Sequence, residues 1–153
     1  NQWIDVADQS AIAVVRRAAQ SLAAKHGWPR LRIDELAIVA TEATTNILRY
    51  AGKGRVLIDM FPKAGGEQMV MVFTDRGPGI SDMDHMFQDG VSSGASAGLG
   101  LGAIRRLSAA FDIFRGPAGC PALARPLAQD PPRHRATVAA PELAAWCPKT
   151  PRS

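Results

Sequence analysis

Apolar side chains recur at helical spacing in two stretches near the start of the chain. The first stretch predicts a helix that Ser10 caps and that ends near Gly27 and Pro29. Its apolar positions are Ala11, Val14, Val15, Ala18 and Leu22. A second helix is predicted from about Asp34 to Gly52. Its apolar face consists of Leu36, Ala40, Ala43 and Ile47.

The pattern then changes to that of β-strands. The stretches "RVLIDMF" (55–61) and "QMVMVFTD" (68–75) are rich in residues that suit a pleated surface, and "PKAGGE" between them is typical of a hairpin turn. After a segment crowded with Gly, Ser and Asp, "LGAIRRLSAA" (101–110) predicts a helix and "FDIF" (111–114) a short strand. We therefore expect an α+β fold, a two-layer sandwich with helices on one face of a mixed, mostly antiparallel sheet.

Composition indicates the class of protein but does not indicate its function. The 153 residues suit one compact domain, and 46% hydrophobic with 21% charged residues is ordinary for a globular protein. No apolar run approaches the roughly eighteen residues of a membrane span, and the first ten residues do not resemble a signal peptide. The chain has two cysteines, Cys120 and Cys147, so we expect no disulfide framework. We expect a cytoplasmic location.

The net charge of +4 is unevenly distributed along the chain. Residues 1–114 contain 12 basic and 12 acidic residues, whereas residues 115–153 contain 6 basic and 2 acidic ones. The latter segment also holds eight of the eleven prolines, so it predicts an extended or disordered tail. The folded part thus has no excess positive charge to suggest nucleic-acid binding, and no direct nucleic-acid partner is expected.

The stretch "SAGLGLGAIRRL" (96–107) partly matches a dinucleotide-binding turn. No buried strand precedes it and no carboxylate follows about twenty residues later, so that interpretation fails. A P-loop would also need a lysine followed by a hydroxyl residue after the glycines. Two interpretations remain open: a flexible linker, or a helix N-terminus whose free backbone N–H groups face a phosphate.

Two other clusters surround this motif in sequence. Glu42, Asn46 and Arg49 share one stripe of the second predicted helix, which is also the pattern of an ordinary solvated face. Asp75 ends a predicted strand and is followed by Gly77 and Gly79, where a flat ligand could approach the backbone beside a carboxylate. An Asp followed by Gly-Pro-Gly is equally a plain turn.

Together, E-x-x-x-N on a helix, D-x-G-x-G after a hairpin and G-x-G-x-G before a helix resemble the nucleotide-binding boxes of the GHKL ATP-binding (Bergerat) fold. The stretches "ATEATTNILRYAG", "DRGPGISD" and "AIRRLSAAFDIF" especially resemble bacterial anti-sigma-factor serine kinases of the switch type. The resemblance covers about residues 10–115 and implies ATP and Mg²⁺ as cofactors.

The resemblance also implies a role for each matching residue. Glu42 acts as general base or orients a substrate hydroxyl, Asn46 binds Mg²⁺, and Asp75 accepts the adenine amino group. Arg49 adds positive charge near the phosphates or is an ordinary surface residue. The backbone positions expected beside the base and around the phosphates are Gly77, Gly79, Ile80, Gly98, Leu99, Gly100, Leu101 and Gly102. Residues 92–97 are expected to form a short lid.

The resemblance ends beyond Phe114. There the family pattern has a strand with Gly-x-Gly-Thr, whereas this chain continues "RGPAGCPALARPLAQDPP". We therefore expect an ATP-binding domain over residues 1–115 and a Pro-rich basic tail or linker over residues 116–153. Thr137 in "RATVAA" is an alternative, by a longer route, for the missing threonine.

The resemblance implies a cytoplasmic protein serine/threonine kinase that phosphorylates a small regulatory protein of the STAS fold. Its partner is an anti-sigma antagonist or a stress-complex protein. A non-catalytic, nucleotide-gated module that sequesters a sigma factor or a phosphatase is the alternative. No membrane partner is expected, and the sequence leaves both a monomer and a homodimer open.

Overall fold

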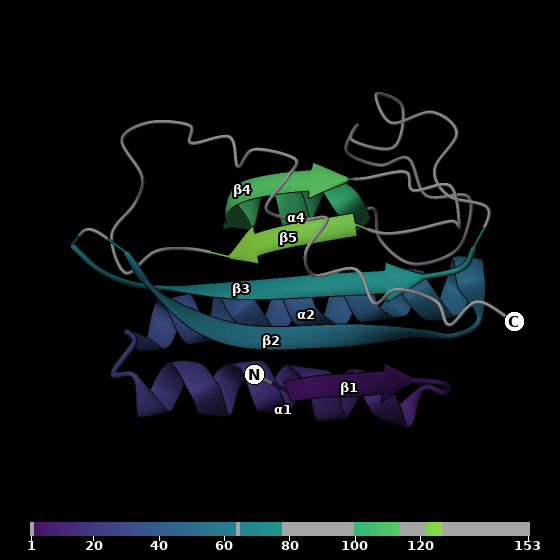
Figure 1. Ribbon diagram of the computed structural model, residues 1–153, viewed down its shortest axis with the longest axis horizontal. Helices are drawn as coiled ribbons and strands as arrows, with labels where there is room; N and C mark the ends of the chain where they lie inside the picture. Colours follow the sequence, from purple (N-terminus) through teal and green to yellow (C-terminus); the bar gives the residue numbers. More distant parts are fainter. Residues whose placement is uncertain (1, 64, 78–99, 114–121, 127–153) are drawn as a thin grey trace, which may run out of the picture.

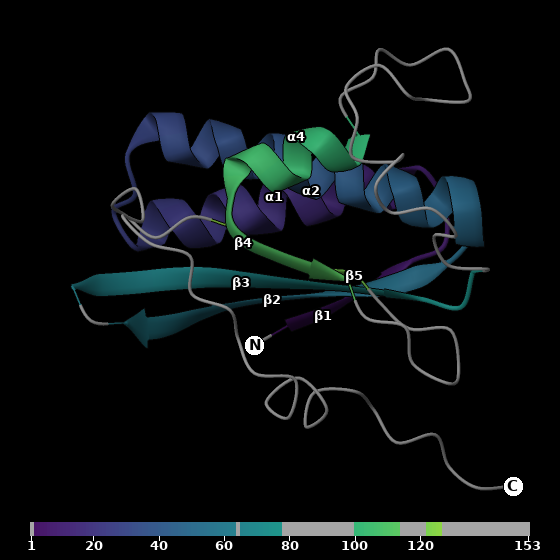
Figure 2. The same ribbon diagram turned by 90° about the horizontal axis from the view of Figure 1, so that it is seen from above.

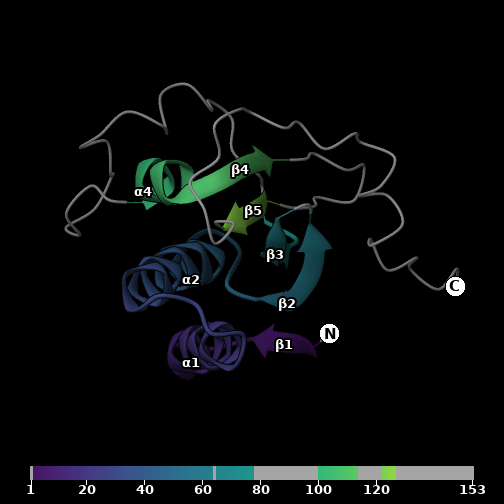
Figure 3. The same cartoon turned by 90° about the vertical axis from the view of Figure 1, so that its left-hand side faces the viewer.

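Residues 2–63, 65–77, 100–113 and 122–126 are described by the computed structural model. Along the chain they form β1 (Gln2–Val6), α1 (Ser10–Lys25), α2 (Arg30–Ala51), β2 (Gly54–Lys63), β3 (Gly66–Asp75), α4 (Gly100–Leu107), β4 (Ser108–Ile113) and β5 (Ala122–Pro126). The predicted α+β class is confirmed, with helices α1, α2 and α4 on one face of the sheet (Figures 2 and 3). Among these residues no helix is long and apolar enough to cross a membrane.

The described strands form one sheet in the order β1-β2-β3-β5-β4. Every pairing among these strands is antiparallel, whereas a mixed sheet was expected. The β2–β3 hairpin is the longest pairing and runs from Gly54 opposite Asp75 to Lys63 opposite Gly66. Because the hairpin turn lies at one end, the residue that ends β3 is carried to the opposite end of the sheet (Figure 1).

Two strands were not predicted from the sequence. β1 is five residues long, too short for its alternating buried positions, Ile4 and Val6, to stand out. β5 lies in the stretch expected to be a proline-rich tail, yet it pairs with both β3 and β4. Its register places Leu123 opposite Val72, so the sheet extends beyond the expected domain boundary at residue 115.

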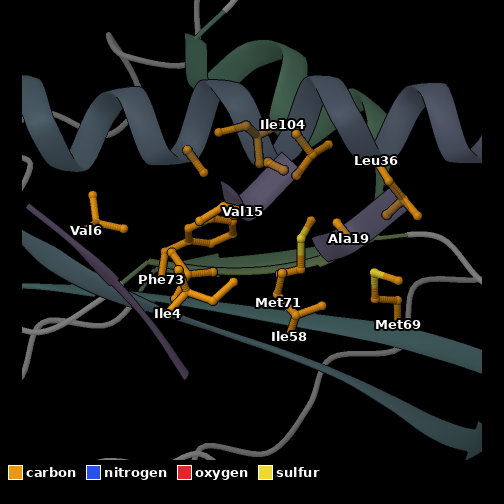
Figure 4. Packing of buried hydrophobic residues seen from close by; sticks show 14 of the residues in the cluster. Ile4, Val6, Val15, Ala19, Leu36, Ile58, Met69, Met71, Phe73 and Ile104 are labelled. Atoms are coloured by element: carbon orange, nitrogen blue, oxygen red, sulfur yellow. The ribbon is translucent and has the colours of Figure 1, made fainter. Parts of the chain in front are cut away.

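The core fills the space between the helices and the sheet (Figure 4). All four residues predicted for the apolar face of α2 are buried. Along α1, however, Val14 was expected in the core and is 44% exposed, because the buried positions follow a strict spacing of four. The buried α1 residues are Ala11, Val15, Ala19 and Ala23.

The helix boundaries correct two further expectations. Ser10 is the first residue of α1 and does not cap it; instead its backbone N–H and hydroxyl both donate to Oδ1 of Asp8, at 2.7 and 2.5 Å. These hydrogen bonds, the hydroxyl's foremost, lower the pKa of Asp8. α2 begins at Arg30 and not near Asp34, because the carbonyl of Pro29 already accepts hydrogen bonds from the N–H groups of Arg32 and Ile33. The predicted end near Gly52 is confirmed, and its φ of 73° is one that glycine adopts readily.

Candidate functional site

The stripe on α2 lies in the C-terminal half of that helix. Glu42 and Asn46 are half-buried, and Arg49, one turn nearer the helix end, is exposed. Their neighbours Ala43 and Ile47 are buried and anchor this part of the helix in the core. The stripe therefore runs along the border of the packed face, and the helix backbone fixes where its polar groups lie.

Two of the three threonine hydroxyls beside the stripe are satisfied within the helix, whereas Thr44 Oγ1 is buried and has no hydrogen-bond partner among the described residues. Thr41 Oγ1 donates to the carbonyl of Ala37, and Thr45 Oγ1 donates to the carbonyl of Thr41, both at 2.7 Å. Such back-bonding removes these hydroxyls as competitors for the polar groups of a ligand. Glu42 and Asn46 are thus the polar side chains of this segment suited to a ligand or a metal ion.

Asp75 is the last residue of β3, as predicted from the sequence. Its Oδ1 accepts a hydrogen bond from the backbone N–H of Gly77 at 2.8 Å, which fixes the orientation of the carboxylate. Among the described residues, nothing else donates to this carboxylate, so its second oxygen is free to accept a bond from a ligand.

Gly77 packs directly against the end of α2. A Cβ atom at Gly77 would lie 2.9 Å from Ala51 Cβ and 3.1 Å from Asp75 Oδ1. The first distance is shorter than real Cβ atoms show, and the second is tight, so a side chain at this position would have to push the carboxylate or the helix away. The close neighbour of Gly77 in the structure is α2, and the approach of a flat ligand to this backbone stays a prediction.

Gly54, the first residue of β2, packs closely against both β3 and α2. It was not predicted from the sequence as a residue of the site. A Cβ there would overlap the carbonyl oxygen of Thr74 and lie 2.7 Å from Ile47 Cγ2. Gly54 also pairs with Asp75 across the hairpin. The turn of α2 that carries Asn46 is thereby held against the strand end that carries Asp75. The glycine of "AGKGRV" that begins β2 was the available signal.

The third motif provides the start of α4. Gly100 is its first residue, and a Cβ added there would meet nothing within 4 Å in the part of the chain that the structure describes. Leu101 and Gly102 are buried, so these two positions could reach a ligand only through their backbone. The first N–H groups of a helix have no partner within it, and the helix dipole is positive there. This end of α4 can therefore receive a phosphate group.

These groups gather at one end of the molecule. The C-terminal half of α2, the end of β3 and the first turn of α4 lie on the same side, away from the β2–β3 turn (Figures 1 and 2). Gly79, Ile80, Gly98, Leu99, the expected lid at 92–97 and Thr137 lie outside the described residues. Within the described ranges, no group of three or more His, Cys, Asp or Glu side chains could hold a metal ion.

The residues present fit a nucleotide. The site offers one oriented carboxylate for a base, helix N–H groups for phosphates and an amide oxygen for a magnesium ion that keeps most of its ligands from phosphates and water. Fold and site together define a nucleotide-binding α+β domain of the histidine kinase-like ATPase class. A family model described as "Histidine kinase-like ATPase domain" matches residues 6–121, and the chain belongs to this family.

Among characterised proteins, the chain is similar to the serine/threonine-protein kinase RsbT of Bacillus subtilis (strain 168). The two are 28% identical over 102 residues, which is 67% of this chain and 77% of the relative. The resemblance to GHKL domains and to this type of serine kinase is thereby confirmed. ATP is the ligand that the family description implies.

Proposed function

We propose that the protein is an ATP- and Mg²⁺-dependent protein serine/threonine kinase that acts as a regulatory switch and phosphorylates a small STAS-fold protein. The observation that carries the proposal is that the C-terminal half of α2, which contains Glu42 and Asn46, lies on the same side of the domain as the end of β3 and the start of α4 (Figure 1). Its similarity to a serine/threonine-protein kinase favours phosphoryl transfer to a protein hydroxyl over other ATPase activities.

Each described residue has a distinct task in this mechanism. ATP, when bound with Mg²⁺, supplies the γ-phosphoryl group. Glu42 accepts a hydrogen bond from the substrate hydroxyl and then its proton, which makes the oxygen a better nucleophile. Asn46 contributes its amide oxygen to the metal ion, and Asp75 accepts a hydrogen bond from the exocyclic amino group of the base.

The polarity of the site also suits the charges that the reaction spreads over the phosphate oxygens. The first N–H groups of α4 point their positive ends toward the ligand and need no reorganisation during transfer. Because Leu101 is buried in the core, the start of α4 is held in place by packing. Fixed dipoles of this kind stabilise a transition state more effectively than mobile water does.

The decisive experiment is transfer from γ-labelled ATP to a panel of purified STAS-domain proteins, with and without EDTA. The proposed kinase labels at least one of them, on Ser or Thr, and labelling stops when Mg²⁺ is removed. ATP-dependent binding of a partner without any labelling would contradict the proposal and favour a nucleotide-gated module that sequesters a sigma factor or a phosphatase.

Two variants separate the roles on α2. Glu42→Gln is expected to keep Mg-ATP affinity and to lose transfer by about 100-fold or more, as is usual when a general base is removed. Asn46→Ala is expected to weaken binding itself and to reduce its dependence on Mg²⁺. Calorimetry and the transfer assay measure the two effects.

Glu67→Gln is the matched control, since Glu67 lies on the β2–β3 hairpin, where Oε2 is 2.6 Å from Nδ1 of His26 at the other end of the sheet. This control should leave both binding and transfer unchanged. Equal loss of binding in the Glu42 and Asn46 variants would mean that the stripe is structural.

A further inference from the structure

Two aliphatic side chains on α2 are exposed to solvent. Leu31 is 68% exposed and Ile38 is 43% exposed. Single exposed aliphatic residues are ordinary on protein surfaces, so neither means much alone. Their spacing places them on one face of the helix, because residues seven apart lie on the same side, about 10 Å from each other along the axis.

The same face leads to the proposed general base. Glu42 follows Ile38 by four residues, so all three side chains project within a narrow sector of α2. Along the helix axis, Glu42 is about 6 Å from Ile38 and about 17 Å from Leu31. We call these three positions, Leu31, Ile38 and Glu42, the α2 track.

The charged side chains beside the track neutralise one another. Arg30 Nε lies 3.1 Å from the carboxylate of Asp34. Arg32 Nη1 lies 2.7 Å from Oε2 of Glu35, and both of these side chains are mostly shielded from solvent. The N-terminal half of the track therefore presents aliphatic surface without a net charge of either sign. Such a surface suits an apolar patch on a folded protein and offers nothing to an acidic or a basic peptide.

We propose that the α2 track is the docking surface for the protein substrate. The substrate seats an apolar patch on Leu31 and Ile38, and this places a Ser or Thr hydroxyl, about 6 to 17 Å further along, at Glu42. The inference rests on the proposed kinase function and adds to it the chemistry of the substrate surface. Specificity then comes from a surface outside the nucleotide site, and ATP binding does not depend on it.

The test is the double variant Leu31→Gln/Ile38→Gln. Glutamine has a helix propensity close to that of leucine and better than that of isoleucine, so α2 should keep its stability. With a STAS-domain protein that the wild-type chain labels as substrate, kcat/KM should fall about tenfold or more, mainly through KM for that protein. KM for ATP should not change.

Val14→Gln is the matched control, because Val14 is also aliphatic, is 44% exposed and lies on a different helix, α1. It should leave both KM values unchanged. If the wild-type chain and the double variant label the STAS-domain protein equally well, the docking proposal alone is overturned. A similar loss in Val14→Gln, or a raised KM for ATP in the double variant, would overturn it too, because the effect would then not be specific to the track. Labelling of no STAS-domain protein by the wild-type chain would overturn the kinase function and the docking proposal with it.

Discussion

At the scale of single residues, the site depends on how closely strand and helix approach. Asp75 is oriented by the N–H of Gly77, and Gly77 has room only because neither it nor the facing Ala51 carries a larger side chain. Gly54 brings β2 against Ile47 in the same way. Small residues thus set the distance between the carboxylate and the polar stripe of α2. A larger side chain at Gly77 or Gly54 would push the strand and the helix apart.

Asp75→Asn should abolish ATP binding and leave the fold intact. The amide oxygen of asparagine can still accept the Gly77 N–H, which preserves the turn. It lacks the negative charge that makes a carboxylate hydrogen bond roughly twice as strong as a neutral one. Isothermal calorimetry measures the loss, and Asp5→Asn on β1 is the control. ATP affinity equal to that of the wild type would remove Asp75 from the site.

At the scale of elements, the sequence predicted best where a pattern was long. The 22-residue α2 and the two 10-residue strands of the hairpin were found because many positions repeat the same period. β1 and β5 have five residues each and were missed, and β5 was hidden further by Pro121 just before it and Pro126 at its end. Their strand conformation is set by pairing with β2, β3 and β4, which is tertiary information.

The same limit applies to the site. Asp75 and the stripe on α2 could be proposed from the sequence because each stands in a recognisable motif. Gly54 was not proposed, since its importance comes from its contacts with Thr74 on β3 and Ile47 on α2, which depend on the fold. The roles of Glu42, Asn46 and Asp75 remain predictions, because motifs indicate residue types at a spacing and not which ligand they touch.

The start of α4 gives a prediction at this scale. Gly100→Ala should leave the free energy of unfolding unchanged or raise it by up to about 1 kcal/mol, since alanine favours helix and its methyl group meets none of the described residues within 4 Å. ATP affinity should nevertheless fall about tenfold, because the methyl group occupies space where a phosphate approaches the backbone. Thermal unfolding and calorimetry measure the two quantities.

Adenosine serves as the control ligand for this variant, because it lacks phosphates and should bind as it does to the wild type. If ATP affinity were undiminished, the start of α4 would not be a phosphate site. If adenosine binding fell equally, the variant would act through the base or through the fold.

At the scale of the whole molecule, the described elements of the site all lie before the proline-rich segment along the chain. Its elements, α2, the end of β3 and α4, all precede residue 108, and the last described strand ends at Pro126. The expected tail was defined from residue 116, whereas β5 lies inside the sheet. The part that can be removed without touching a described element therefore begins at residue 127.

Deleting residues 127–153 should leave ATP affinity nearly unchanged. The segment has only five apolar residues larger than alanine among its 27, to offset the roughly 1 to 2 kcal/mol per residue that ordering a backbone costs. Calorimetry on the shortened chain and hydrogen exchange on the full chain measure its contribution. Loss of ATP binding on deletion, or slow exchange at residues 136–140, would contradict the linker role and favour Thr137 as part of the site.

The position of β5 also determines when the sheet can be finished. β5 is the last described strand along the chain, yet it lies between β3 and β4, and among the described strands it is the only partner of β4. During synthesis from the N-terminus, the helices and the β2–β3 hairpin can associate early, because their contacts are local in sequence. The edge of β3 stays unpaired until residues 122–126 leave the ribosome. Until then, the nascent chain exposes an open strand edge to its neighbours.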